Sequence, residues 1–499
     1  MPRDAPPVSP RRASVTANRV AAARVARNSA GRALGEAVGK IATLALTVVL
    51  ARETGRAGLG VYVFALAWAE LTTALLGPGL DRLLMRRVAT DRQQLGRLLG
   101  DILVLKALRG VPIVALSWMA LAILGYAAGT RAVVYLMTVA YVLDAFNLTL
   151  LRAFEGLERA ELVGLTLSVQ RIVAAGLGLA AVLAGFGLRT IAAGYIVASA
   201  VALGIAFALL AGQAGSPDVH TDARSRRDLG RSARPFAAQE VLAGGLARLD
   251  AILISLLVGQ STVGVYGAAY RLFEATLLVS TALSSAFVAM FTYLQRDSEP
   301  SLGAVFNRAL KVAVAVLVPV AVAMMVLPDS LLALIYGAKF QDGSGALRAL
   351  GPTAVLLAVV ILATTLVVSR RDPQLLLKTF TVGLAVNLGL NLALIPVLDA
   401  TGAGLAMLGT ELVLVVITLR LARIEVGRIP VSATFGAALL AGTAMGATLA
   451  LLPIPLAPAL LAAGVVYLVV FTVTEHHVAP TDLKLIIDLV RNRTGGKGS

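Results

Sequence analysis

Long runs of apolar residues alternate with short polar segments along most of the chain. Each run is long enough to cross a bilayer as an α-helix, which takes about 20 mostly apolar residues. A transmembrane β-barrel would instead show alternating segments of about ten residues, whereas runs such as Leu460–Val473 are continuous. The pattern therefore predicts an all-α polytopic membrane protein. Its fourteen expected spans lie near residues 31–52, 60–80, 98–126, 131–151, 163–186, 190–212, 236–258, 264–291, 304–327, 346–368, 376–397, 402–421, 431–452 and 457–475.

The amino-acid composition supports the same class. Of the 499 residues, 58% are apolar and 14% are charged, whereas soluble domains average about 45–50% and about 25%. The chain has no cysteine and three histidines, which excludes a disulfide framework, a thiolate zinc site and an iron–sulfur cluster. We therefore expect no cofactor and no metal site.

Basic residues give the chain a formal charge of +16, and their positions predict its orientation. Lys and Arg accumulate in the cytoplasmic loops of polytopic proteins, so this excess does not call for a nucleic-acid partner. Arginines crowd the loops after even-numbered spans, such as 81–97 and 212–235, and are sparse in the intervening loops. We expect a multi-pass protein of the cytoplasmic membrane, with a basic cytoplasmic tail at 1–30 and a second cytoplasmic tail at 476–499. Four basic residues near span ends are expected to extend toward the membrane surface: Lys106, Arg109, Arg308 and Lys311.

An internal repeat appears when the chain is shifted on itself by 204 residues. The shift places Gly60-Val61-Tyr62 on Gly264-Val265-Tyr266, and it also aligns two pairs of glutamates: Glu36 with Glu240, and Glu70 with Glu274. Six predicted spans separate the copies, so both copies cross the membrane in the same direction and an axis along the membrane normal relates the halves.

The repeat predicts two parallel six-helix lobes and two additional helices. The expected parts are an N-lobe at 31–212, a cytoplasmic linker at 213–235, a C-lobe at 236–421 and two further helices within 431–475. Two such lobes facing one another enclose a cavity that can open to either side, which is typical of transporters.

Ionisable residues at membrane depth are the candidates for function, because burying each one there costs about 2.5–3.5 kcal/mol on insertion scales. Guanidinium and ammonium groups suit phosphate oxygens, so the basic candidates for substrate binding in the cavity are Lys40, Arg248 and Arg271. The acidic candidates for ion coupling or charge pairing are Glu36, Glu70, Asp144, Glu240, Asp250 and Glu274.

The same residues have a structural alternative, and the sequence does not decide between the two. Glu36 and Lys40 are four residues apart on one predicted helix, and Arg271 and Glu274 are three apart, so each pair can neutralise itself and only hold helices together. For Asn387 and Asn391, bonding from helix to helix is favoured over lining the cavity.

No enzyme signature is present in the sequence. The chain has no P-loop, no HExxH and no GxSxG motif, and its predicted external loops are short. A polysaccharide polymerase or glycan ligase would need a long external loop with catalytic residues. We expect a transporter rather than an enzyme, driven by an ion gradient or by consumption of its product.

Several segments resemble the polysaccharide-biosynthesis flippases of the MOP exporter superfamily. The resemblance rests on ARETG (51–55), GLGVY (58–62), GLDRLL (79–84), LRAFEG (151–156), ARLD (247–250), VGVY (263–266), AAYRL (268–272) and LIYG (334–337) with Phe340. Their order and spacing are similar to those of the O-antigen and exopolysaccharide flippases. One departure is Leu76-Gly77-Pro78-Gly79, where relatives more often have an acidic residue before the glycine.

This resemblance implies a flippase that moves an undecaprenyl-diphosphate-linked oligosaccharide to the outer leaflet by alternating access. Cationic cavity residues would hold the diphosphate while the lipid tail stays in the bilayer. Membrane lipids and a glycan polymerase or glycosyltransferases are the implied partners. The alternatives are a cation-coupled multidrug antiporter of the same superfamily and a lipid II flippase, which shares fourteen spans.

Overall fold

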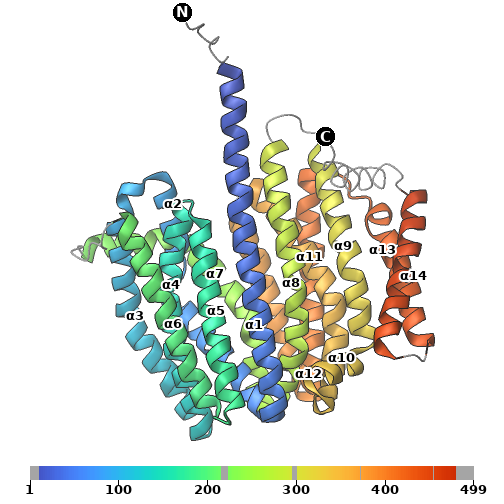
Figure 1. The fold of residues 1–499 in the computed structure, drawn as a ribbon, viewed down its shortest axis with the longest axis horizontal. Helices are drawn as coiled ribbons and strands as arrows, with labels where there is room; N and C mark the ends of the chain where they lie inside the picture. The colour runs from blue at the N-terminus through green and yellow to red at the C-terminus, as the bar shows by residue number, and fades with distance from the viewer. Residues whose placement is uncertain (1–9, 215–222, 295–300, 371–372, 453–454, 479–499) are drawn as a thin grey trace, which may run out of the picture. The chain divides into compact units, whose positions relative to one another are not determined.

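The computed structural model describes residues 10–214, 223–294, 301–370, 373–452 and 455–478, and most side chains from residue 39 onward. Every element in these ranges is a helix (Figure 1). The helices are α1 (Pro10–Ala74), α2 (Leu80–Thr90), the 3₁₀ turn η1 (Arg92–Gln94), α3 (Leu95–Ile123), α4 (Ala128–Gly156), α5 (Ala160–Leu183), α6 (Leu188–Ala214), α7 (Ala223–Leu257), α8 (Gln260–Leu294), α9 (Ser301–Val326), α10 (Pro328–Tyr336), the 3₁₀ turn η2 (Ala338–Gly343), α11 (Ser344–Arg370), α12 (Pro373–Val426), α13 (Val431–Leu451) and α14 (Leu456–Val478). The predicted all-α class is confirmed.

Two of these helices are each a pair of predicted spans. Gly55 interrupts α1 with φ 68°, a backbone region that glycine enters without a steric penalty, and it separates the predicted spans 31–52 and 60–80. Asp399 interrupts α12 with φ 52° and separates the spans 376–397 and 402–421. Among the described residues, ten helical segments are long and apolar enough to cross a membrane, and α7 and α8 are not among them. The count of fourteen therefore stays a prediction.

The chain divides into two compact units. Unit 1 comprises residues 1–46 and 72–240, and unit 2 comprises 47–71 and 241–499. The second half of α1 thus groups with α8 to α14, although the repeat predicts it within the N-lobe. The lobes at 31–212 and 236–421 and the linker at 213–235 stay predictions. The tail at 1–30 has no described side chains, and most of the tail at 476–499 lies outside the described residues.

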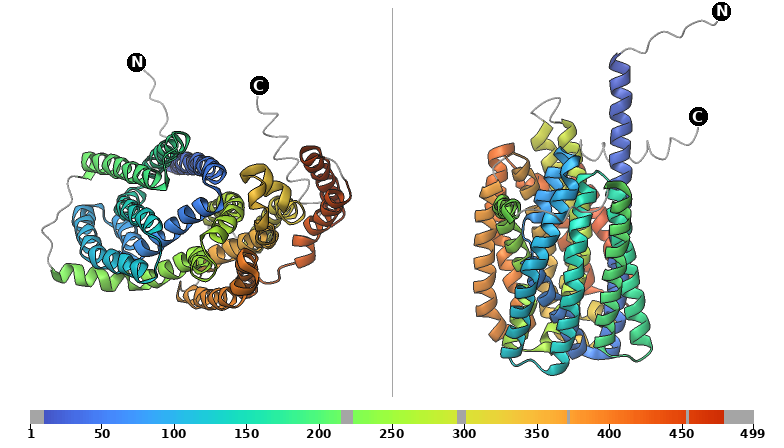
Figure 2. Two further views of the ribbon diagram at one scale, coloured as in Figure 1. Left: turned by 90° about the horizontal axis from the view of Figure 1, so that it is seen from below. Right: turned by 90° about the vertical axis from the view of Figure 1, so that its left-hand side faces the viewer.

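Within unit 1, α3, α4, α5 and α6 run side by side (Figures 1 and 2). The short helix α2 packs on the C-terminal end of α4, where a Cβ on Gly156 would lie 2.9 Å from Val88 Cβ. Leu80, Leu84 and Val88 form the buried face of α2. Three arginines occupy positions of α2 outside this buried face: Arg82, Arg86 and Arg87.

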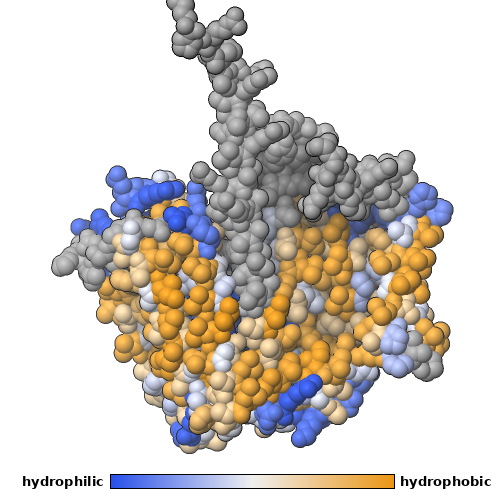
Figure 3. Space-filling view, in the orientation of Figure 1, coloured by the Kyte–Doolittle hydropathy of each residue, from blue (hydrophilic) through white to orange (hydrophobic). Residues whose placement is uncertain are grey.

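Within unit 2, α11 packs against α8, α9 and α12, and α13 packs against α9 and α14. Large apolar side chains are exposed on the outer helix faces of each unit, among them Ile123 and Leu183 in unit 1 and Leu451 and Leu461 in unit 2 (Figure 3). Exposed apolar surface on this scale would be unfavourable in water. The chain is therefore a multi-pass membrane protein.

Candidate functional site

Four charged side chains meet inside unit 2, and we call them the charge cluster: Glu70 from α1, Arg248 from α7, and Arg271 and Glu274 from α8. Arg248 Nε donates a 2.8 Å hydrogen bond to Glu70 Oε2, and Arg248 Nη2 lies 4.0 Å from Glu274 Oε1. Arg271 Nη1 donates to Glu274 Oε2 at 2.6 Å. Two guanidinium groups therefore face two carboxylates, which lowers the cost of holding each charge away from water.

The local helix spacing explains this arrangement. Arg271 and Glu274 stand three residues apart and so lie on one face of α8, where their side chains are 14% and 24% exposed. Glu70 and Arg248 are 178 residues apart and meet only because the second half of α1 packs in unit 2. The structure contains the Arg271–Glu274 pair that the sequence allowed, and it adds the Arg248–Glu70 pair.

Next to the charge cluster, a chain of hydrogen bonds surrounds Asp250 of α7. Asp250 Oδ2 accepts from the Tyr266 hydroxyl at 2.8 Å, and Oδ1 accepts from Asn391 Nδ2 at 2.7 Å. Asn391 also donates to Asn387 Oδ1 at 3.0 Å, and Asn387 donates to Thr410 at 3.3 Å. Buried carboxylates require such partners. This chain joins α7, α8 and α12, so the predicted helix-to-helix role of the two asparagines is confirmed.

A small cavity joins the charge cluster to Asp250. Arg248, Asp250, Tyr266, Tyr270 and Arg271 all line it, and its volume is about 20 Å³. That is room for about one water molecule. The two arginines predicted to bind substrate therefore lie on one cavity, whose volume in this conformation is too small for a diphosphate.

The two copies of the repeat cross at their glycines. A Cβ on Gly60 would lie 1.7 Å from the carbonyl oxygen of Gln260, and a Cβ on Gly264 would lie 2.0 Å from that of Arg56. Residues 56 and 260 are themselves related by the shift of 204. The second half of α1 and α8 thus pack with local twofold symmetry, and only glycine permits this approach of the two backbones.

Two arginines tie the start of this helix pair to α10 and η2. Arg52 donates to the carbonyl oxygens of Leu334 at 2.7 Å and Ile335 at 3.1 Å. Arg56 pairs with Asp342 and donates to the carbonyl oxygen of Lys339. Arg52 and Arg56 were not among the residues predicted to be functional; their presence in an otherwise weakly basic set of loops was the available signal.

In unit 1, the described acidic candidates are held by neighbouring groups. Asp144 of α4 accepts from Gln170 of α5, which also donates to Ser199 of α6 at 3.4 Å. Glu240 of α7 accepts the backbone N–H of Gly79 at 2.6 Å and lies 3.2 Å from Arg82 Nε.

Glu240 thus receives donors at the start of α2, where the positive end of the helix dipole favours a carboxylate. Lys40 is half-buried on α1, near the point where a Cβ on Gly39 would meet the side chain of Arg171 at 2.1 Å. The side chain of Glu36 lies outside the described residues.

Lys106 corrects one expectation. It does not extend to the membrane surface but is 2% exposed, and its Nζ donates to Asp81 Oδ1 at 2.9 Å and Oδ2 at 2.7 Å. Thr149 Oγ1 at 2.8 Å and the carbonyl oxygen of Ala145 at 2.7 Å complete its contacts.

Lys311 departs from the same expectation, since its Nζ lies 2.5 Å from the buried carboxylate of Glu475. Sequence reasoning missed Asp81 and Glu475. The only signal for either was an acidic residue near the end of an apolar run.

The family of the chain follows from its sequence. A model of the polysaccharide biosynthesis protein family matches residues 49–344, which is more than half of the chain and contains the whole charge cluster. The chain belongs to the polysaccharide biosynthesis protein family. The resemblance to the polysaccharide-biosynthesis flippases is thereby confirmed. The contacts that Gly60, Gly264 and Arg52 make between α1, α8 and α10 all fall inside the matched region.

Two relatives in Haloferax volcanii match part of the chain. One is the probable low-salt glycan biosynthesis flippase Agl15, 23% identical over 159 residues. The other is the probable flippase AglR, 29% identical over 164 residues. Each alignment covers 32% of this chain and 34% of the relative. The chain therefore matches about a third of the length of these relatives.

Solved structures show the same fold at low identity. The lipid II flippase MurJ in an inward closed conformation matches with a TM-score of 0.72 at 12% identity, over 89% of this chain and 97% of that one. An inward-facing multidrug resistance MATE transporter of the MOP superfamily matches with a TM-score of 0.61 at 18% identity, over 78% of this chain and 94% of that one. This family member therefore has the MOP-superfamily fold.

Proposed function

We propose that the protein is a flippase that moves an undecaprenyl-diphosphate-linked oligosaccharide from the cytoplasmic to the outer leaflet by alternating access. The observation that carries the proposal is the placement of Arg248 and Arg271 on one small cavity of unit 2. Membership in the polysaccharide biosynthesis family supports it, as do two relatives named as probable flippases.

The chemistry of the charge cluster suits a diphosphate. Two guanidinium groups offer forked pairs of N–H donors that match phosphate oxygens. Without substrate, Glu70 and Glu274 neutralise Arg248 and Arg271 and so limit the cost of burying them. When the head group enters, its negative charges replace the carboxylates as partners of the arginines. Lys40 is our third cationic candidate for the substrate cavity.

The acidic candidates divide into two groups by their surroundings. Asp144, Glu240 and Asp250 each accept hydrogen bonds from neighbouring side chains or backbone, which supports roles in joining helices. Glu70 and Glu274 lose their arginine partners when substrate binds, which makes them our candidates for ion coupling. Glu36 is retained as a candidate because the repeat relates it to Glu240.

The substrate site and the repeat crossing lie along the same two helices. Gly60 and Glu70 are ten residues apart on α1, and Gly264 and Glu274 are ten apart on α8, about 15 Å at 1.5 Å per residue. We infer that exchange of arginine partners at Glu70 and Glu274 loosens this helix pair and its ties to α10, and that this helps to open the outer side.

The proposed orientation follows the distribution of basic residues. Both termini and the segment 213–235 lie in the cytoplasm, and the N-lobe and C-lobe rock about the repeat axis. The substrate lipid and bulk membrane lipids are the direct partners, and a glycan polymerase or glycosyltransferases act before or after the transport step. In this proposal the protein is not an enzyme.

Complementation of a gene deletion tests the proposal. Deletion should remove the surface glycan and leave lipid-linked oligosaccharide in the inner leaflet, measured by leaflet-specific chemical labelling. Arg248→Ala and Arg271→Ala should each fail to restore the glycan while remaining in the membrane at normal levels. Arg348→Ala is the matched control, because Arg348 is 57% exposed and pairs with Asp329 outside the cluster. A normal surface glycan in the deletion strain would refute the proposal.

The alternatives give different outcomes in the same strains. A lipid II flippase would leave lipid II in the inner leaflet and stop peptidoglycan synthesis. The inward closed MurJ structure supports that alternative only at the level of fold. A multidrug antiporter would change resistance to organic cations, although two guanidinium groups on the cavity of unit 2 disfavour cationic substrates.

A further inference from the structure

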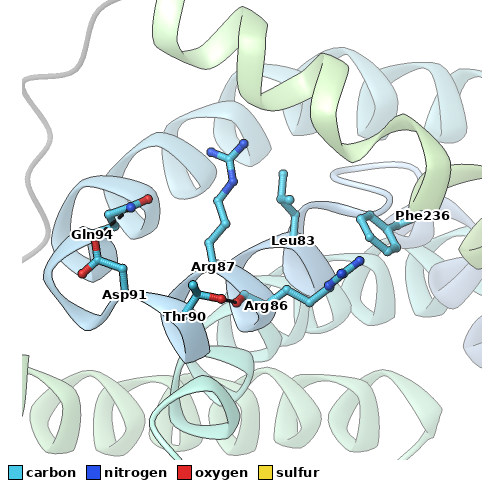
Figure 4. A pocket seen from close by; sticks show the side chains of 7 residues that line it. All are labelled: Leu83, Arg86, Arg87, Thr90, Asp91, Gln94 and Phe236. Atoms are coloured by element: carbon cyan, nitrogen blue, oxygen red, sulfur yellow. Dashed lines mark hydrogen bonds between the residues drawn. The ribbon is translucent and has the colours of Figure 1, made fainter. Parts of the chain in front are cut away.

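A second hollow lies on unit 1, at the surface of α2. Its volume is about 490 Å³, within the range of small-molecule sites. Figure 4 shows the side chains around it, which come from α2, the junction between α2 and η1, η1 itself and α7: Leu83, Arg86, Arg87, Thr90, Asp91, Gln94 and Phe236. The proposed transport function uses none of these residues.

The hollow carries two positive charges that no carboxylate of the described residues neutralises. The Arg86 guanidinium lies over the Phe236 ring, 5.7 Å from its centroid, and Arg87 donates to the Ser232 hydroxyl at 3.3 Å. Asp91 also lines the hollow, but its two oxygens accept from Gln93 N at 3.0 Å and Gln94 Nε2 at 2.9 Å rather than from either arginine. With two arginines and one aspartate, the lining keeps a net positive charge. The hollow therefore attracts anions.

The first half of α7 carries further arginines on its solvent-exposed face. Leu229 and Ala233 of this segment are buried against α2 and its neighbours, so its other face is open to solvent. That face carries four exposed arginines, with Asp228 as the exposed acid among them: Arg224, Arg227, Arg231 and Arg234. Their combined field increases the local concentration of anions.

The hollow also has an apolar side and lies at the end of the apolar surface. Leu83 and Phe236 give it apolar lining, and α2 covers the ends of α3 and α4 (Figure 1). In Figure 3, hydrophobic side chains cover the lengths of these helices, and hydrophilic ones gather at the level of α2. A ligand here would have its charged group in the head-group region and its carbon chain against the apolar surface below.

We propose that this hollow binds the phosphate-bearing head group of an anionic phospholipid. Arg86 and Arg87 hold the phosphate, Gln94 and Thr90 offer further hydrogen bonds, and Leu83 and Phe236 contact the first carbons of the chains. The bound lipid joins α2 to the first half of α7, because Arg86 and Arg87 come from one helix and Phe236 from the other.

Native mass spectrometry of the purified full chain tests the proposal. Phosphatidylglycerol should bind more tightly than phosphatidylcholine. The double variant R86Q/R87Q should reduce the affinity for phosphatidylglycerol about 25-fold, at about fivefold for each charge. The single variants should each lose about fivefold, which keeps the test valid if the double variant folds poorly. The control R159Q removes an exposed arginine of the same unit that already pairs with Glu161, and it should bind like the wild type.

Three results would overturn the proposal. The first is equal binding of phosphatidylglycerol and phosphatidylcholine, and the second is unchanged binding in both single variants. The third is displacement of phosphatidylglycerol by inorganic phosphate or polyprenyl phosphate at equal concentration, which would assign the hollow to free phosphate or to the substrate lipid. Lipid binding is measured without transport, so failure of the flippase proposal leaves this test unaffected.

Discussion

Replacing Lys106 with Met tests the buried contacts of unit 1 most directly. The substitution keeps the side-chain length but removes the ammonium group that contacts both oxygens of Asp81. The Asp81 side chain is 7% exposed, and of the side-chain donors described here only Thr149 Oγ1, at 2.9 Å, would remain. Removing one partner of a buried ion pair costs about 3–5 kcal/mol, so K106M should lower the free energy of unfolding by about that amount.

A second variant separates the charge from the packing. The double variant D81N/K106M removes both charges and keeps the side-chain volumes, so it should recover more than half of the lost free energy. Reversible unfolding in mixed micelles measures both values, and K378M, at an exposed lysine of α12, is the control. If K106M and K378M unfold alike, or if the double variant is less stable than K106M, the description of this buried pair is wrong.

Two further substitutions test the helix contacts of unit 2. Gly60→Ala places a Cβ 1.7 Å from a backbone carbonyl oxygen of α8, so the two helices must separate and the free energy of unfolding should fall by about 1–3 kcal/mol. The control is Gly176→Ala, which has nothing within 4 Å of the new Cβ and should be neutral or stabilising. Equal effects of the two substitutions would contradict the close crossing of the helices. Asn391→Ala removes a hydrogen-bond donor to Asp250, which is 3% exposed. The free energy of unfolding, measured with heat or denaturant, should fall by about 1–3 kcal/mol. An unchanged value would show that Asp250 does not need this hydrogen bond.

The repeat was the most informative feature that sequence alone provided about the structure of unit 2. A shift of 204 residues aligned Gly60 with Gly264, and the structure brings these glycines into direct backbone contact. Helices related by a repeat can pair about a local symmetry axis, so aligned residues such as Gly60 and Gly264 can meet where the two helices cross. The alignment did not reveal that residues 47–71 pack with the second unit, because similarity between copies does not state which copy each helix contacts.

Sequence alone determined the membrane class, the helical content and the family, because these depend on the length and order of apolar runs and on local motifs. The tertiary structure decided the partners of the buried charges, since Arg248 and Glu70 are 178 residues apart and no periodicity relates them. Lys106 shows why the partner of a buried charge depends on tertiary packing. A Cβ on Gly77 would lie 2.9 Å from Lys106 Cε, so the missing side chain at Gly77 makes room for the lysine to turn inward to Asp81 rather than outward to the membrane surface.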